Sequence, residues 1–377
     1  MILANAKIVT DDFRLKQLDI EIKEDKIVKI GENLDGDEKI DLSGKYILPG
    51  FIDVHIHGAV GERLSGNGNP DMQKILNYEA TQGVTGVAIS LCVESYENIL
   101  KQLELAAETA MKTKSTKILG INAEGPFISI KYKGAMYEEF IIKPDVKKID
   151  EMIEHSKELL KIIAIAPEWE NSSDFIRYAV EKGITISIGH TNATYEETMS
   201  AIEAGATHAV HTFNAMRPFN HRDPGVLGAV LTSEKVYCEA ICDYIHLHPV
   251  TVDMIYKLKG EDRMIMVSDS VNAAGLDVKE FEINGRKCTV EHGVIRLPDG
   301  TICGSSMTLL NGVQHLIERG IPIEKVAKMA SYNPAKSIKK ETEVGSIAVG
   351  KYADLVVLDG EYNVSNTFIN GVCVYEK

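Results

Sequence analysis

The sequence predicts an α/β fold: a (β/α)8 TIM-type barrel with a small β-sandwich domain formed by both chain termini. Three observations predict it. Eight short apolar segments, rich in β-branched residues, alternate with helical patterns through the middle of the chain. The two ends of the chain instead carry short strands in which apolar and polar residues alternate. The length of 377 residues suits one large barrel plus a modest second domain.

The β-rich ends define the predicted small domain. Segments 2–9, 18–22 and 26–30 alternate apolar and polar residues between turn-forming clusters, and segment 368–375 reads as a hairpin with Asn370-Gly371 as its turn. We therefore expect residues 1–50 and 342–377 to form the small β domain. Residues 51–341 would form the barrel, with a β ribbon inserted near 281–303.

The barrel strands are predicted in order along the middle of the chain. They are expected at 50–54, 84–91, 117–123, 161–166, 184–188, 207–210, 236–241 and 264–267. The helical patterns between and after them include 98–113, 147–160, 173–182, 195–204, 323–329 and 334–340. Eight β/α repeats in about 220 residues predict a (β/α)8 barrel.

Composition excludes several classes of function. The formal net charge is −14, so the field of the whole protein repels polyanions, and we expect neither nucleic acid nor an anionic membrane as a partner. No apolar run approaches the roughly 20 residues that span a bilayer. The first residues lack the pattern of a signal peptide, and six cysteines are too sparse for a disulfide framework. We expect a cytoplasmic protein.

Ionisable residues gather where the predicted strands end, which is where barrels of this kind carry their active sites. Imidazole and carboxylate are ligands that suit Zn and Fe, and residues i and i+2 of a strand face the same side. The candidate ligands are His55, His57, Glu124, His190, His211 and Asp269, and the seventh strand leads to His246. The pattern predicts a site for a divalent metal.

Simpler readings exist for several of these residues. The pair His55 and His57 alone could be two half-exposed polar residues, and Asp269 could be a cap or a member of a structural ion pair. Asp53 shares the inward parity of His55 but is expected to hold structure rather than metal. Glu124 favours the ligand interpretation, because a buried carboxylate without a partner is costly.

The motifs resemble the amidohydrolase superfamily and, within it, the N-acetylglucosamine-6-phosphate deacetylases. The general marks are segments 49–58 and 345–356 with Asp269, and the more specific ones are 124–127, 189–193, 211–216, 223–228 and 243–249. Most amidohydrolases link two metals with a lysine on strand four. Here that strand ends in Ala166-Pro167, and Glu124 on strand three takes its place, as in the deacetylase branch.

The resemblance implies roles for the site residues. Glu124, His190 and His211 would hold the main metal, and His55, His57 and Asp269 would help to hold a second. Asp269 would be the general base and later the general acid, and His246 would contact the acetamide carbonyl. The substrate contacts implied are Ala135, Asn214, Ala215, Arg222 and His246. A homodimer is also implied.

The expected reaction is hydrolysis of N-acetylglucosamine 6-phosphate to glucosamine 6-phosphate and acetate. Arg222 makes physical sense in such an acidic chain, because a guanidinium fork supplies local positive charge for a phosphate. Met136 stands where the family usually has a histidine that contacts the sugar. N-acetylgalactosamine 6-phosphate therefore stays open as the substrate, as do a cyclic-amidase or dipeptidase activity and a non-catalytic scaffold.

Overall fold

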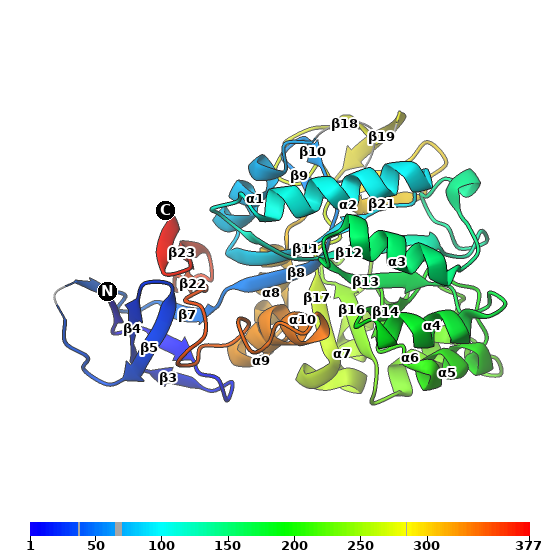
Figure 1. Cartoon of the computed structure of the whole chain (residues 1–377). Coiled ribbons are helices and arrows are strands. Elements are labelled where there is room, and N and C mark those ends of the chain that lie inside the picture. The colour runs from blue at the N-terminus through cyan, green and yellow to red at the C-terminus, as the bar shows by residue number, and fades with distance from the viewer. Residues whose placement is uncertain (37, 65–69, 284) are drawn as a thin grey trace.

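A barrel of eight parallel strands forms the body of the protein (Figure 1). The computed structural model describes residues 1–36, 38–64, 70–283 and 285–377. Each predicted barrel strand has a counterpart, which confirms the expected fold class. The strands are β8 (Phe51–Ile56), β11 (Val84–Leu91), β12 (Lys117–Phe127), β13 (Leu160–Ile165), β14 (Thr185–Ile188), β15 (His208–Ala209), β16 (Tyr237–Ile241) and β17 (Met264–Val267).

Helices cover the outside of the barrel and bury one apolar face each. In α2, for example, the buried residues include Ile99, Leu103 and Ala106, which recur at helical spacing. The α-helices are α1 (Met72–Thr81), α2 (Tyr96–Ala110), α3 (Val146–His155), α4 (Ser172–Glu181), α5 (Tyr195–Ala204), α6 (Gly225–Thr232), α7 (Pro249–Arg263), α8 (Leu309–Glu318), α9 (Ile323–Ala327) and α10 (Asn333–Ser337). A 3-10 turn spans Glu138–Phe140 and a π-helical turn spans Lys328–Tyr332. Among the described residues, no helix is long and apolar enough to cross a membrane.

One predicted helix is too long. The pattern at 147–160 continues past the end of α3, but the helix ends at His155 with Ser156 as its C-cap. Lys157 and Glu158 have positive φ angles of 50° and 66°, which a right-handed helix cannot continue through. The next apolar residue, Leu160, already belongs to strand β13. The predicted helix was too long because apolar residues continue at helical spacing from α3 into strand β13.

The barrel closes between its first and last strands. The amide of Asp269 donates to the carbonyl of His55 over 2.9 Å, and the amide of His57 donates to the carbonyl of Ser270 over 2.8 Å. The buried carboxylate of Asp53 adds a side-chain link, since it accepts from the amides of His55 at 3.1 Å and Ser268 at 3.3 Å. Burial raises the pKa of Asp53 to about 6. Asp53 thus joins β8 to β17, as a structural residue would.

Both ends of the chain build two further sheets beside the barrel (Figure 1). The four-stranded sheet has the order β5-β4-β1-β6, and the six-stranded sheet has the order β24-β23-β22-β7-β2-β3. These strands are β1 (Ile2–Ala4), β2 (Lys7–Val9), β3 (Leu15–Gln17), β4 (Asp19–Lys23), β5 (Lys26–Gly31), β6 (Lys39–Asp41), β7 (Tyr46–Pro49), β22 (Leu355–Leu358), β23 (Val364–Ile369) and β24 (Val372–Glu376).

The two sheets share one apolar core, with Leu3 and Ile20 contributed from one side and Ile47, Leu355 and Phe368 from the other. This is the packing of a β sandwich. We propose the division of the chain into 1–50 with 342–377, and 51–341, on this basis.

A β ribbon covers the end of the barrel where the strands finish. Its strands are β18 (Glu280–Ile283), β19 (Arg286–Glu291), β20 (Val294–Arg296) and β21 (Ile302–Ser305), in the region expected to be a ribbon. The amide of Ser305 donates to the carbonyl of Asp269 over 2.8 Å, which ties the ribbon to the end of β17. A short hairpin of β9 (Gly58–Ala59) and β10 (Glu62–Arg63) lies on the same end of the molecule (Figure 1).

Replacement of Asp53 by alanine should weaken the closure of the barrel. The change removes a buried acceptor and leaves backbone amides unsatisfied, so we expect the free energy of unfolding to fall by about 2 kcal/mol. Asp53→Asn keeps an acceptor oxygen of the same reach and should lose much less. Urea unfolding of the three proteins measures this difference, and equal losses for both variants would contradict the proposed linking role.

Candidate active site

A cavity of about 470 Å³ opens at the end of the barrel, between the strand ends and the ribbon. It is lined by predicted site residues together with side chains from the ribbon and from the loop after β12. The predicted site residues that line it are His57, Glu124, Ala135, His190, His211, Asn214, Ala215, His246 and Asp269. His55 lies just below this surface and has no exposed side-chain area.

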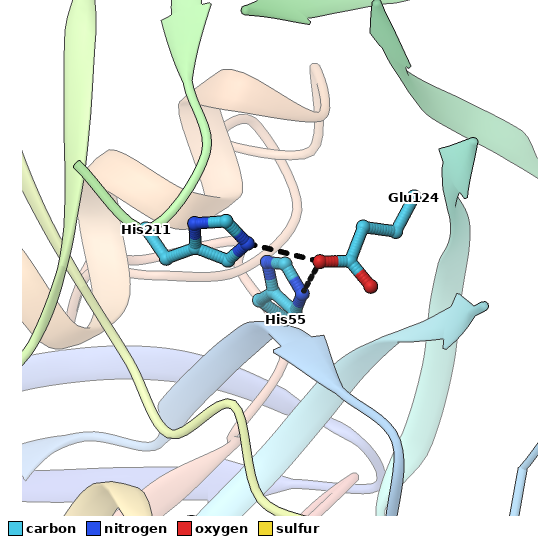
Figure 2. A group of neighbouring side chains, drawn as sticks. All are labelled: His55, Glu124 and His211. Carbon is cyan, nitrogen blue, oxygen red and sulfur yellow. Dashed lines mark hydrogen bonds and ion pairs between the residues drawn. The ribbon is translucent and has the colours of Figure 1, made fainter. Parts of the chain in front are cut away.

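Glu124 is the centre of the site. It lies on β12, and its Oε1 atom is 2.9 Å from Nε2 of His211 and 3.0 Å from Nε2 of His190. Figure 2 shows His55 and His211 turned toward this same oxygen, with His55 Nε2 at 3.5 Å. The other carboxylate oxygen of Glu124 is 3.2 Å from Nε2 of His57. Four imidazoles therefore face one buried carboxylate.

Asp269 completes the cluster from the end of β17. Its Oδ1 atom is 3.4 Å from His57 Nε2 and 3.7 Å from His55 Nε2. Its side chain is 13% exposed, against 4% for Glu124 and none for His55. Asp269 is thus the carboxylate of the cluster that solvent and substrate reach most easily.

Partners on the far side of each ring set which nitrogen faces the cluster. Nδ1 of His190 donates to the carbonyl of Tyr132 over 2.8 Å, which leaves Nε2 with its lone pair directed at Glu124. Nδ1 of His55 is 3.0 Å from a carboxylate oxygen of Glu239, and Nδ1 of His57 is 3.2 Å from the sulfur of Cys92. Such outer partners are how proteins orient metal-binding imidazoles.

The backbone at three of these residues is strained. His190, His211 and Asp269 have φ angles of 45°, 25° and 49°, in a region that residues other than glycine rarely adopt. Such conformations persist only where the surrounding structure enforces them. Here they let side chains at the ends of three different strands turn inward to one point.

The cluster needs positive charge at its centre. Burial alone would raise the pKa of Glu124, but the surrounding histidines outweigh it and hold that pKa well below its usual range. For His55, burial lowers the pKa, but hydrogen bonding to Glu124 and its charge outweigh that effect and raise the pKa well above its usual range. A buried carboxylate among inward-facing imidazole nitrogens fits a divalent cation, which supplies that charge. The described residues also group into sets of three that could hold an ion, including His55 with Glu124 and His211, and His55 with His57 and Asp269.

His246 is fixed at the edge of the cavity. Its Nδ1 is 2.7 Å from Oδ2 of Asp243, which also accepts from the hydroxyl of Ser305 at 3.1 Å. Burial lowers the pKa of His246, but the hydrogen bond and charge of Asp243 outweigh it and raise the pKa above its ordinary value. The ring can therefore present Nε2 to a ligand as a hydrogen-bond donor.

The predicted substrate contacts divide into two groups. Ala135, Asn214 and Ala215 line the cavity. Arg222 does not line it: the residue is exposed, and its amide donates to the side chain of Asn220 over 3.0 Å within the same loop. Residues of a single chain therefore form both the cluster and its cavity, whereas Arg222 lies outside the cavity lining.

Sequence reasoning missed four residues that surround the site. Glu239 lies in the middle of β16, where its carboxylate contacts His55 and forms an ion pair with His208. The side chains of Glu239 and His208 are both fully buried. A charged residue inside an otherwise apolar strand was the available signal. Cys92 follows β11 and contacts His57, while Arg63 and Arg286 line the cavity. Cys92 lies in a loop, Arg63 on the β9–β10 hairpin and Arg286 on the ribbon. In such segments the spacing of residues in the sequence does not predict where a side chain points.

A (β/α)8 barrel with a buried histidine and carboxylate cluster at its strand ends defines a metal-dependent hydrolase. The amidohydrolase family model matches residues 46–374. The chain belongs to the amidohydrolase family.

Relatives of known activity match nearly the full chain. An N-acetylglucosamine-6-phosphate deacetylase from Lysinibacillus sphaericus is 32% identical over 95% of this chain and 94% of its own length. An N-acetylgalactosamine-6-phosphate deacetylase from Escherichia coli is 28% identical over 86% of each. The structure of a mutant N-acetyl-D-glucosamine-6-phosphate deacetylase from Mycobacterium smegmatis, in complex with N-acetyl-D-glucosamine-6-phosphate, superposes with a TM-score of 0.93, covering 99% of each chain at 28% identity.

Metal binding should respond differently to changes in three buried glutamates. Glu124→Gln removes the central charge, so we expect most of the bound metal to be lost. Glu239→Gln should weaken metal affinity about tenfold, because it disturbs the orientation of His55. Glu79→Gln is the matched control: burial raises the pKa of Glu79 to about 8, so this side chain is mostly neutral at pH 7.

Metal content is measured by elemental analysis, and affinity by competition with a chelator. Metal affinity unchanged in Glu239→Gln would contradict the orienting role. An equal loss in Glu79→Gln would show that any buried substitution disturbs the site.

Proposed function

We propose that this enzyme removes the acetyl group from N-acetylglucosamine 6-phosphate, giving glucosamine 6-phosphate and acetate. The observation that carries the proposal is the cluster around Glu124, with His190 and His211 facing one of its oxygens at the floor of a sugar-sized cavity. The deacetylase relatives match this chain almost from end to end, which supports the same reaction here.

The cluster would hold one or two divalent ions, with Zn and Fe the metals we favour. Glu124, His190 and His211 would hold the first, and His55, His57 and Asp269 would hold a second that shares Glu124. Six donor side chains exceed the four that a single structural zinc uses, which supports room for two ions. A bound divalent metal supplies Lewis acidity, which makes hydroxide available near neutral pH and polarises the scissile carbonyl.

Asp269 would move the proton in this reaction. Its carboxylate borders the cavity and is the most exposed acid of the cluster, so it can accept a proton from water. It would then pass the proton to the amide nitrogen, because an amine leaves poorly without one. The short link from its amide to the carbonyl of His55 fixes its position relative to the ligands.

His246 would bind the carbonyl oxygen of the acetamide. Asp243 accepts from Nδ1, and its hydrogen bond and charge outweigh burial and raise the pKa of the ring, so the protonated imidazolium would offer its second N–H, at Nε2, to the substrate. A donor that is already oriented stabilises developing negative charge without reorganisation during the reaction.

The rest of the sugar would be held by Ala135, Asn214 and Ala215, which border the same cavity. Met136 also lines it and offers no hydrogen-bond donor to a sugar hydroxyl. N-acetylgalactosamine 6-phosphate is the second candidate substrate for this reason, and a relative of that activity supports it.

We also propose that the protein works as a homodimer in the cytoplasm. Helix α7 exposes Val250, Met254 and Leu258, spaced by four residues along one face, and Phe219, in the loop before α6, is 57% exposed. An apolar stripe of this kind suits a second copy of the chain. Arg222 lies in the exposed loop that carries Phe219, so a neighbouring subunit would give it a route to a substrate phosphate. None of the six cysteines, all among the described residues, forms a disulfide, which suits a reducing compartment.

Acetate release should be fastest with N-acetylglucosamine 6-phosphate. We expect the galacto epimer and unphosphorylated N-acetylglucosamine each to show kcat/KM reduced by about tenfold or more, because each loses binding energy that positions the amide. Steady-state assays of the metal-loaded enzyme with the three compounds test this order. Preference for the galacto epimer would replace the proposed substrate, and no acetate from any of them would overturn the proposed reaction.

Asp269→Asn should lower kcat by about 100-fold or more, because the amide cannot take the proton. The comparison requires equal metal content in both proteins, measured before each assay. Turnover near that of the unmodified enzyme, at equal metal content, would remove Asp269 from the proton path.

A further inference from the structure

Three cationic side chains line the cavity although the chain carries a net charge of −14. They are Arg63, Lys131 and Arg286. Among the described residues that line the cavity, the carboxylates are Glu124 and Asp269, and both belong to the metal cluster. Once metal neutralises that cluster, the remaining charge on the cavity wall is positive.

The guanidinium of Arg286 is held in place at the edge of β19. It donates a hydrogen bond from Nη2 to the carbonyl of Ala135, and its central carbon lies 4.5 Å from the centre of the Tyr137 ring. Its Nε atom is buried and has no hydrogen-bond partner among the described residues. A planar cation fixed on one edge and stacked on a ring is already oriented to bind an anion with its other donors.

Arg63 reaches the same part of the cavity from the hairpin that follows β8. It pairs with Gly58 in the β9 and β10 ladder, directly after the ligand His57. Cys288 is a buried residue on strand β19 of the ribbon. The pKa of its thiol is lowered to about 7, first by a hydrogen bond with Cys303 and further by the charges of Arg286 and Arg63. Both arginines also line the same cavity.

This region is separate from the proposed contacts at Asn214 and Ala215. Those two residues follow β15, which is three strands around the barrel from β8 and three strands from β12. Arg63 follows β8, and Arg286 bonds the loop after β12. A substrate whose amide lies at the metal cluster would therefore meet the arginines with a different face from the one that meets Asn214.

We propose that Arg63 and Arg286 form a binding subsite for an oxyanion, a phosphate or a carboxylate carried by the substrate. The inference rests on the proposed deacetylation and names two specificity-determining residues for it. The oxyanion has two possible sources: the 6-phosphate itself, or an acidic substituent elsewhere on the sugar ring. Lys131 at the exposed rim adds positive field that attracts either one.

Kinetic constants for three sugars distinguish the sources. The compounds are N-acetylglucosamine 6-phosphate, neutral N-acetylglucosamine, and N-acetylmuramic acid, which carries a carboxylate through an ether at its third carbon. The variants are Arg63→Met and Arg286→Met, with Arg296→Met as the matched control. Arg296 lies on β20 of the same ribbon, is exposed, and bonds the carbonyl of Gly300 outside the cavity lining.

Arg63→Met and Arg286→Met should each raise KM about tenfold for an acidic sugar and leave KM for the neutral sugar unchanged. An effect on the 6-phosphate identifies the phosphate as the bound group, and an effect confined to N-acetylmuramic acid identifies a ring substituent. Arg296→Met should change neither. Equal effects on neutral and acidic sugars, or no effect on any, would overturn the subsite.

Binding of inorganic phosphate provides a test that needs no turnover. Calorimetry on the metal-loaded proteins should give a Kd about tenfold weaker in each cavity variant than in Arg296→Met, and equal values would overturn the subsite. If the unmodified enzyme releases no acetate from any sugar but phosphate binding still depends on the arginines, the proposed reaction fails and the subsite stands. Arg286→Lys, with its thermal midpoint measured, checks that lost binding does not reflect a misfolded loop at Ala135; binding retained at least in part is expected.

Discussion

A single buried charge, the carboxylate of Glu124, determines how the rest of the site is built. Removed from water, it is stable only because histidine rings from three other strands turn toward it. Those rings are in turn oriented by the carbonyl of Tyr132, the sulfur of Cys92 and the carboxylate of Glu239. The barrel places these groups at one end, where they could hold a cation that balances their charge. The strand ends that close the barrel therefore also carry residues of the candidate active site.

The fold could be predicted because each barrel strand is buried on both faces and so reads as a continuous apolar run. The clustering of the predicted site residues could be foreseen because the barrel rule places such side chains directly after those runs, as at Glu124 and His190. Asp53 is expected to hold structure rather than metal although it shares the inward parity of His55, and its carboxylate does join the first strand to the last. Regular elements fix side-chain direction, and that is why these inferences hold.

The irregular parts of the site could not be predicted in the same way. Arg286 comes from a ribbon whose position depends on a bond between Ser305 and the end of β17, far away in the sequence. Glu239 is hidden in an apolar strand, and its partner His208 pairs with it only because their strands are neighbours. Helix α3 ends where two residues adopt positive φ, which no apolar period indicates. Long-range contacts decided the positions of Arg286 and Glu239, and a local change of backbone conformation decided the end of α3.

The six-stranded sheet beside the barrel interleaves the two ends of the chain. Strand β7, which runs directly into the first barrel strand, has β2 on one side and β22 on the other. While the chain is being synthesised, the edge of β7 that faces β22 stays unpaired until that late strand emerges from the ribosome. An unpaired edge is prone to join other chains. Completion of the barrel and protection of this edge are therefore separated in time, and the interval between them is when the nascent chain is most exposed to misassembly.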